Sequence, residues 1–176
     1  KYAGLDNINP VKGTVMTWVR PSWNTASFSE IDGDQGRYIF SLNESYQNNT
    51  DDFCLNFVVF ESSGTTLLVK KATGEATILN VDNGPESGRW YKNKNTWHQL
   101  AFTWDSSSGE ITVYIDGNPA GKQTFPALSP NTMGDFWVGN TDVDGYKNFH
   151  GKIDLFRIYG APLTGNQIKV LYDAQK

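Results

Sequence analysis

The chain has 176 residues, a formal net charge of −4 and an aromatic-rich composition of 6 Trp, 8 Tyr and 10 Phe. This length suits one domain with a sizeable core, and the charge balance gives no sign of a nucleic-acid partner. Apolar runs such as residues 57–60 are far shorter than the roughly 20 residues of a membrane-spanning helix, so membrane insertion is not expected. The lone Cys54 excludes an internal disulfide, and a histidine-rich zinc site is not expected because only His98 and His150 are present.

Alternation of apolar and polar residues at period two recurs along the chain, in segments rich in β-branched and aromatic residues and separated by Gly, Asn, Asp and Ser. This pattern predicts short strands. The first group covers residues 14–20, 37–43, 53–60, 65–71 and 76–81.

Residues 96–125 predict a three-stranded meander. One strand face carries His98, Leu100, Phe102 and Trp104, and the next strand carries Ile111, Val113 and Ile115. The pair Asp116-Gly117 tolerates positive φ and predicts a tight hairpin after the second strand.

A further strand is predicted over residues 152–159. The capping-box pattern Thr164-Gly165-Asn166-Gln167 then predicts one short C-terminal helix. Many strands without crossover helices favour an all-β fold of two antiparallel sheets packed face to face. No composition shift, linker or repeat divides residues 1–176, so we expect a single domain, excised from a larger protein.

Several segments carry a resemblance to a known family. These are Trp97–Asp105 (WHQLAFTWD), Val113–Gly117 (VYIDG), Phe149–Tyr159 (FHGKIDLFRIY) and Val15–Pro21 (VMTWVRP). In order and spacing they resemble the laminin-G-like branch of the concanavalin A-like jelly rolls, which includes pentraxins. The resemblance implies a jelly-roll β-sandwich, often with bound calcium, and a glycan-binding or adhesion role within a larger protein.

The clearest metal candidate places oxygen ligands at alternate positions, at Asn140, Asp142 and Asp144, before a glycine. Calcium prefers such oxygen ligands. An EF-hand is excluded, because its bidentate glutamate would fall at Gly151. An ordinary Asn/Asp turn remains the alternative.

A second metal candidate is Asp154, which strict alternation places on one face with Phe156 and Ile158. A carboxylate on an apolar face needs a partner. The resemblance implies calcium there, with Asp32 and Asp34 supplying further oxygens; a salt bridge or backbone hydrogen bonds are the alternative.

The segment 30–35 (EIDGDQ) is similar to the catalytic motif of related β-glucanases, but Gln35 stands where the second glutamate is required. Retaining hydrolysis needs two carboxyl groups, and an amide cannot replace either of them. We therefore expect no enzyme activity.

Sugar sites combine exposed aromatic rings with amide, carboxylate and hydroxyl groups. The aromatics set among turn-forming residues are the candidate stacking platforms: Trp90, Tyr91, Trp23, Tyr46 and Tyr146. The alternative for these rings is that they pack flat over a sheet edge. Trp18, Trp97, Trp104 and Trp137 lie in strand-like runs and are expected in the core.

The leading hypothesis is a non-catalytic, lectin-like module that binds a glycan or polysaccharide, with calcium as cofactor. The polar-amide and aromatic composition suits an extracellular, cell-surface or particle-surface protein. Two alternatives remain open. One is a protein–protein adhesion or structural domain without a sugar site, and the other is an unrecognised glycan hydrolase or lyase.

Overall fold

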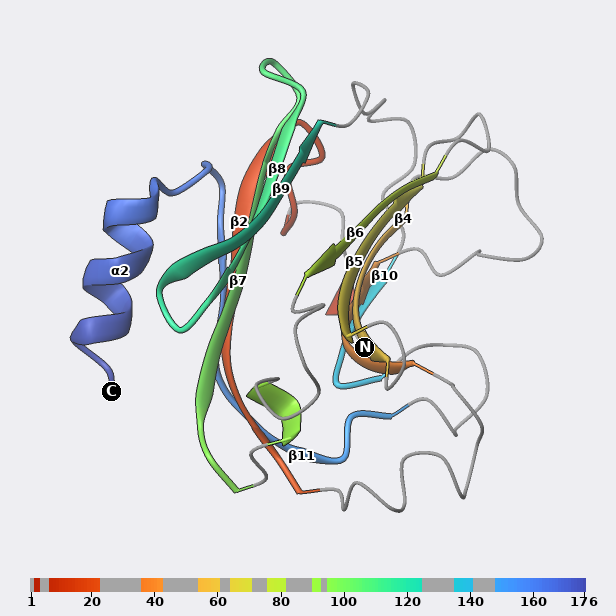
Figure 1. Ribbon diagram of the computed structural model, residues 1–176. Coiled ribbons are helices and arrows are strands. Elements are labelled where there is room, and N and C mark those ends of the chain that lie inside the picture. Colours follow the sequence, from red (N-terminus) through yellow and green to blue (C-terminus); the bar gives the residue numbers. More distant parts are fainter. Residues whose placement is uncertain are drawn as a thin grey trace.

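The computed structural model describes residues 2–3, 7–22, 36–42, 54–60, 64–70, 76–81, 90–92, 95–124, 135–140 and 148–176. These residues form two antiparallel β-sheets packed face to face, with a helix outside one of them (Figure 1). The expected all-β sandwich with a C-terminal helix is therefore confirmed.

The first sheet has six strands in the order β1-β10-β3-β4-β5-β6. Their bounds are β1 (Tyr2–Ala3), β10 (Asp135–Val138), β3 (Arg37–Leu42), β4 (Cys54–Phe60), β5 (Gly64–Lys70) and β6 (Ala76–Val81). Figure 1 shows that β4 and β5 bend so that the face turned away from the second sheet is concave.

The second sheet has five strands in the order β11-β2-β7-β8-β9. Their bounds are β11 (Gly151–Tyr159), β2 (Lys12–Pro21), β7 (His98–Asp105), β8 (Glu110–Ile115) and β9 (Asn118–Thr124). The predicted tight turn joins β8 to β9, with φ of 52° at Asp116 and 75° at Gly117. Both central residues thus have the positive φ of a two-residue hairpin.

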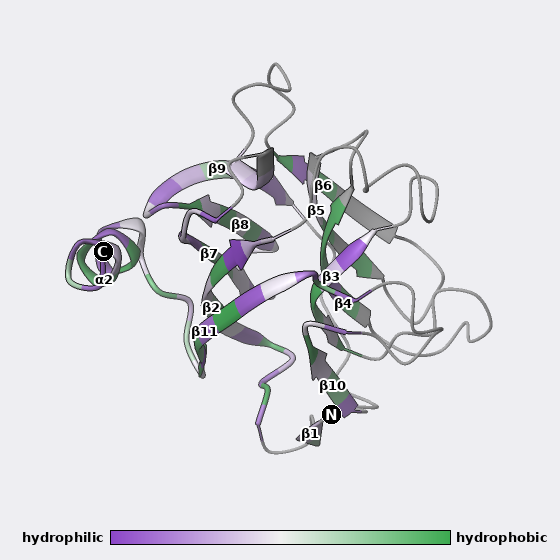
Figure 2. Ribbon diagram, turned by 90° about the horizontal axis from the view of Figure 1, so that it is seen from below, coloured by the Kyte–Doolittle hydropathy of each residue, from purple (hydrophilic) through white to green (hydrophobic). Residues whose placement is uncertain are grey.

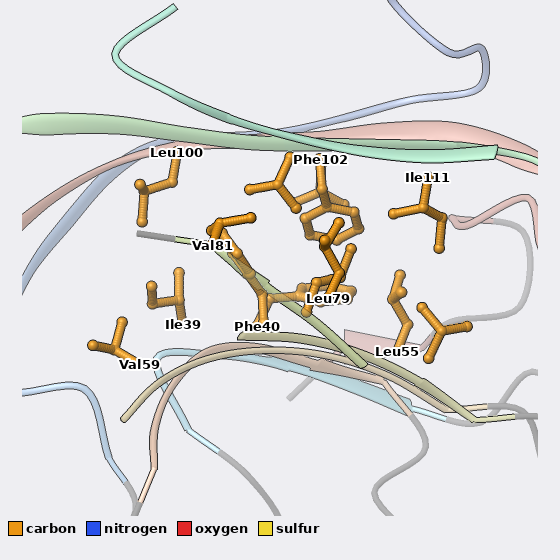
Figure 3. Close-up of a cluster of buried hydrophobic side chains, with 14 of the residues drawn as sticks. Ile39, Phe40, Leu55, Val59, Leu79, Val81, Leu100, Phe102 and Ile111 are labelled. Atoms are coloured by element: carbon orange, nitrogen blue, oxygen red, sulfur yellow. The ribbon is translucent and has the colours of Figure 1, made fainter. Parts of the chain in front are cut away.

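The core lies between the sheets, because each strand turns alternate side chains inward. Phe102 from the five-stranded sheet meets Phe40 and Phe57 from the six-stranded sheet, at ring-centroid distances of 5.9 and 5.4 Å. Figure 3 shows this layer, with Leu100 and Ile111 facing Ile39, Leu55, Val59, Leu79 and Val81. All of these side chains are buried.

The helix α2 (Gly165–Asp173) covers part of the outer face of the five-stranded sheet, as Figure 2 also shows. Thr164 is its N-cap: the Thr164 hydroxyl accepts from the Gln167 N–H, and the Gln167 side chain accepts from the Thr164 N–H. Ile168 is fully buried against Met16, Ala101 and Tyr114 of the sheet. Within the described parts of the chain, no helix is long and apolar enough to cross a membrane.

The strands predicted from alternation are all present with closely matching ends. Two strands were not predicted, β1 and β10. Both are short, at 2 and 4 residues, and too few alternating positions exist in them to establish a period.

Candidate functional site

The outer, concave face of the six-stranded sheet brings together an indole, a hydroxyl and an amide. Trp137 on β10 lies opposite Ser41 on β3, and Ser41 lies opposite Asn56 on β4. All three alternate with core residues, so their side chains project to the outer face. We call these three residues the Trp137 row.

Side-chain hydrogen bonds order this face. The Ser41 hydroxyl donates to Asn56 Oδ1 at 2.9 Å, and further along the face the Thr66 hydroxyl donates to Asn80 Oδ1 at 2.7 Å. Ser41 and Asn56 are fully buried, whereas Trp137 is half-buried and Asn80 is exposed. The face is therefore accessible at its two sides, at Trp137 and at Asn80.

Asn56 has unused hydrogen-bonding capacity. Its Nδ2 is buried and has no hydrogen-bond partner in the part of the chain that the structure describes. An unpaired buried amide donor costs about 1–3 kcal/mol, which a bound water would recover. The Trp137 row thus combines a ring with an apolar face and polar groups of the kind that recognise sugars.

Two of the predicted stacking platforms are wrong. Trp90 and Tyr91 belong to the 3₁₀ helix η2 (Trp90–Lys92) and are only 4% and 1% exposed. The Trp90 indole donates to the Thr65 hydroxyl at 2.7 Å and meets the Tyr91 ring edge-on at 5.7 Å. Here the chain folds back over one end of the sandwich, so both rings complete the core and are unavailable to a ligand.

The tryptophans expected in the core have different outcomes. The prediction is confirmed for Trp18 and Trp104, and it is wrong for Trp97, which is 37% exposed beneath the Arg20 guanidinium at 5.7 Å. The prediction is also wrong for Trp137, which is half-buried on the outer face, where it forms the row described above.

The remaining stacking candidates lie outside the described residues, as do several of the metal candidates and the glucanase-like segment 30–35. These residues are Trp23, Tyr46, Tyr146, Asp32, Asp34, Asp142 and Asp144. Their predicted roles stay predictions.

Asp154 does not face an apolar layer, which corrects the expectation from strict alternation. The pairing of β11 with β2 shifts between Asp154 and Arg157, and Leu155 has a φ of 48°. This bulge inserts one residue, so Ile153 and Phe156 both face the core while Asp154 is exposed on the outer face. Its Oδ1 accepts from the Leu155 N–H at 2.7 Å, a local partner that needs no metal.

Asn140 follows Gly139, which lies beside the Ile153 side chain, whereas Asp154 is exposed on the outer face of β11. Among the described residues, no group of three or more potential ligands of the His, Cys, Asp and Glu types is close enough to hold a metal.

A histidine–carboxylate pair near the β8–β9 turn has a structural role. His98 Nδ1 lies 2.7 Å from Asp116 Oδ2, and Asp116 Oδ1 accepts from the Gln99 N–H at 3.0 Å. The other ring nitrogen, Nε2, is buried and has no partner within the described residues. The pair holds the positive-φ turn against β7.

Two curved antiparallel sheets, with an aromatic and polar row on the concave outer face, define a jelly-roll sandwich of the lectin-like class. The family model of the concanavalin A-like lectin/glucanase superfamily matches residues 3–169. The chain therefore belongs to that superfamily. No curated protein is significantly similar to it in sequence.

Solved structures share the fold at low sequence identity. The binding domain of Paraclostridial Mosquitocidal Protein 1 has 18% identity and a TM-score of 0.67, over 93% of this chain and 37% of that one. A heptameric SAP-like pentraxin from Limulus polyphemus has 16% identity and a TM-score of 0.62, over 94% and 71%.

Domain 4 of an extracellular arabinanase from Geobacillus stearothermophilus, in complex with arabinotriose, has 24% identity and a TM-score of 0.61, over 92% of this chain and 66% of that one. By contrast, the chain spans only 37% of the length of the mosquitocidal binding domain. At identities this low, the TM-scores establish a shared fold and nothing more.

Alternation predicted strands over residues 37–43 and 53–60, but it did not reveal the Trp137 row. The row depends on β10 lying beside β3, and these strands are far apart in the sequence. The only local signal was the strand-like run around Trp137.

Proposed function

We propose that the chain is a non-catalytic carbohydrate-binding module of a larger secreted or surface protein, and that it binds its glycan on the concave face at the Trp137 row. The observation that carries this proposal is the juxtaposition of the Trp137 indole with Ser41 and Asn56 across adjacent strands. An indole offers a stacking surface for sugar C–H groups, while the fully buried Ser41–Asn56 hydrogen bond holds the strands beside it in place.

The relatives support this function. The arabinanase domain is similar over nearly all of this chain, was solved with a bound arabinotriose, and comes from an extracellular enzyme. The superfamily also contains glucanases. A non-catalytic role is favoured because Gln35 replaces one of the two carboxylates that retaining hydrolysis requires.

The proposal is tested by a glycan array, followed by calorimetry with the best oligosaccharide. A shallow site of one ring and a few hydrogen bonds should give micromolar to millimolar Kd. Trp137→Ala should weaken binding by about tenfold or more, since stacking and its apolar contact are lost. Trp97→Ala is the matched control and should leave the Kd unchanged.

Glycan binding that Trp137→Ala leaves intact would place the site elsewhere. If no glycan is retained by the wild-type protein, the proposed function is wrong. Incubation with β-glucans and arabinan should release no reducing ends, and turnover lost in Asp32→Ala would instead identify a hydrolase.

We also propose a calcium site in the segment that follows β10, formed by Asn140, Asp142 and Asp144, with Asp32 and Asp34 as further candidate ligands. Support comes from the donor set: alternating amide and carboxylate oxygens are what calcium prefers. Asn140 is half-buried, where the chain leaves β10 after Gly139 with a φ of 72°. Asp154 is left out of this set, because it is exposed and its carboxylate already accepts from the Leu155 N–H.

Calcium that binds only the folded protein must raise the melting temperature. Free calcium at about 100 times its Kd stabilises the folded state by about 2.7 kcal/mol. We expect the melting temperature to fall on chelation and recover with calcium, and Asp142→Asn with Asp144→Asn to abolish the difference. Asp154→Asn is the matched control and should retain it. Equal melting with and without chelator would rule out the site.

A second candidate function is a protein-binding or adhesion domain. The observation that favours it is the apolar side chain of Val170 on α2, which is 67% exposed, together with the similarity to the mosquitocidal binding domain. This function predicts that the protein retains no glycan on the array and that Val170→Ala weakens its binding to a protein partner. Glycan binding that depends on Trp137 would decide against it.

A further inference from the structure

The outer face of the five-stranded sheet carries a groove at the N-terminus of α2. The groove has a volume of about 350 Å³ and lies between β7, β8 and the segment Pro162–Gly165. Small-molecule sites are usually about 300–1,000 Å³, so this groove has room for one small ligand. It lies on the sheet opposite to the Trp137 row.

The floor of the groove is made of hydroxyl groups. Thr103, Thr112 and Tyr114 each alternate with core residues and so project outward, and Thr103 lies directly opposite Thr112. These side chains are only 7%, 8% and 8% exposed. No hydrogen bond joins their hydroxyls to any other residue that the structure describes, although the hydroxyls line an open groove.

Although these residues are more than nine-tenths buried, none of their hydroxyl oxygens is among the buried unpaired polar atoms, so the hydroxyls reach the open groove. A floor that served only to support the helix would be as well built from Val and Phe, which have no polar group to satisfy. The hydroxyls of such a floor must bond to water or to a ligand, and a ligand with hydroxyl groups can replace that water bond for bond.

The wall opposite the floor is apolar and close. Pro162 and Leu163 line the groove, and a Cβ built on Gly165 would lie 3.6 Å from Tyr114 Cε1 and 3.9 Å from its hydroxyl oxygen. These are ordinary van der Waals distances, so the start of α2 lies directly against the Tyr114 phenol. An apolar wall over a hydroxyl floor suits a ligand with a C–H face and a hydroxyl edge.

Two carboxylates at the open end limit the charge of the ligand. Glu110 is paired with Lys122 at 2.5 Å, and Asp105 Oδ1 accepts from the Ser107 N–H and hydroxyl at 2.8 and 2.6 Å. These hydrogen bonds from Ser107 lower the pKa of Asp105, so its carboxylate is charged at neutral pH. An anionic ligand would be repelled, and a cation would compete with Lys122.

We infer that this groove is a second binding site, for a single neutral sugar unit or similar polyol, held by the hydroxyls of Thr103, Thr112 and Tyr114 beneath the start of α2. The site does not depend on the Trp137 row. The two sites can therefore be tested separately in the same protein.

The experiment is a titration of the ¹⁵N-labelled full chain with D-glucose, D-galactose, D-mannose, D-xylose and L-arabinose, followed by amide chemical shifts. We expect at least one sugar to shift the amides of Thr103, Thr112 and Gly165 saturably, with a Kd in the millimolar range. Thr112→Val and Tyr114→Phe each remove one hydroxyl and little volume. Each should weaken binding about fivefold to tenfold.

Thr124→Val is the matched control, because it makes the same substitution on an exposed residue of the same sheet outside the groove. It should leave the Kd unchanged, and melting temperatures verify that every variant is folded. The inference is overturned if no sugar shifts these amides, or if the folded Thr112→Val and Tyr114→Phe variants bind as tightly as the wild type. Tighter binding of D-glucuronate than of D-glucose would overturn the neutral assignment.

The amides of Ser41 and Asn56 and the Trp137 indole report on the other site. Shifts confined to those groups would overturn the groove while supporting the concave-face proposal. Shifts confined to the groove would support this inference and count against the concave face.

Discussion

Trp90 and Trp97 lie close together in the sequence and occupy opposite environments. Trp90 donates its indole N–H to the Thr65 hydroxyl and its ring lies 5.6 Å from His98, so it joins β5 to β7 across the end of the sandwich. Trp97 lies outside, with one face toward Arg20. The same residue type therefore contributes very different amounts to stability at these two positions.

We expect Trp90→Ala to lower the free energy of unfolding by about 3–5 kcal/mol, because it leaves a cavity and an unpaired Thr65 hydroxyl. Trp97→Ala loses mainly the cation–π contact and should cost about 0.5–1 kcal/mol. Urea unfolding followed by circular dichroism measures both. Equal losses in the two variants would contradict the burial described above.

The environments of individual residues were partly predictable from the sequence. Alternation correctly placed Trp18 and Trp104 in buried positions, because each lies within a long strand. It failed for Trp90, because turn-forming neighbours indicate a loop but do not show that the loop folds over an open end of the core. It failed for Trp97, which directly precedes β7.

At the scale of elements, α2 shows how a short helix is fixed to a sheet. The capping box satisfies its first turn, and the Leu163 N–H donates to the Thr14 hydroxyl at 2.8 Å. Near its other end, Tyr172 stacks on Trp18 at 5.6 Å and the Trp18 indole donates to Gln175 Oε1 at 2.9 Å. A helix of 9 residues is too short to be stable alone, so these contacts determine whether it forms.

Ile168→Ala should therefore destabilise α2 far more than Val170→Ala. Ile168 is fully buried, and its truncation should cost about 2–5 kcal/mol. Val170 is exposed, so its truncation should change stability by about 0.5 kcal/mol or less. Urea unfolding gives the totals, and hydrogen exchange of the helix amides shows where the loss occurs. Similar exchange in both variants would mean that α2 does not depend on Ile168.

Elements defined by local signals were predictable, and those defined by distant partners were not. Thr164 and Gln167 alone predicted the start of α2, and Asp116-Gly117 predicted the β8–β9 turn. The bulge in β11 was missed, because Asp154-Leu155-Phe156 continues an acceptable alternation and only the pairing with β2 shows the extra residue. That one insertion moves Asp154 from the predicted apolar face to the surface.

At the scale of the whole molecule, the two sheets are joined by one continuous core. Phe102 links them, since its ring meets Phe40 and Phe57 of the facing sheet. Two strand pairs also join parts of the chain that are far apart in the sequence: β2 pairs with β11, and β3 pairs with β10. Neither sheet can bury its inner face alone, so we expect them to unfold as one unit.

This cooperativity is tested by Phe102→Ala, which should lower the free energy of unfolding by about 3–5 kcal/mol. Native-state hydrogen exchange should show the same decrease for the slowest amides of β4 in one sheet and of β7 in the other, because both exchange through global unfolding. Phe102→Leu, with a smaller loss, serves if the alanine variant does not fold. Tyr2→Ala is the control. Tyr2 is 58% exposed on the edge strand, and among the described residues its ring stacks only on Phe136, at 5.1 Å. Its loss should therefore affect neither set of amides strongly. A decrease confined to the five-stranded sheet would mean that the sheets unfold separately, and the outer-face sites proposed above would then belong to independently stable layers.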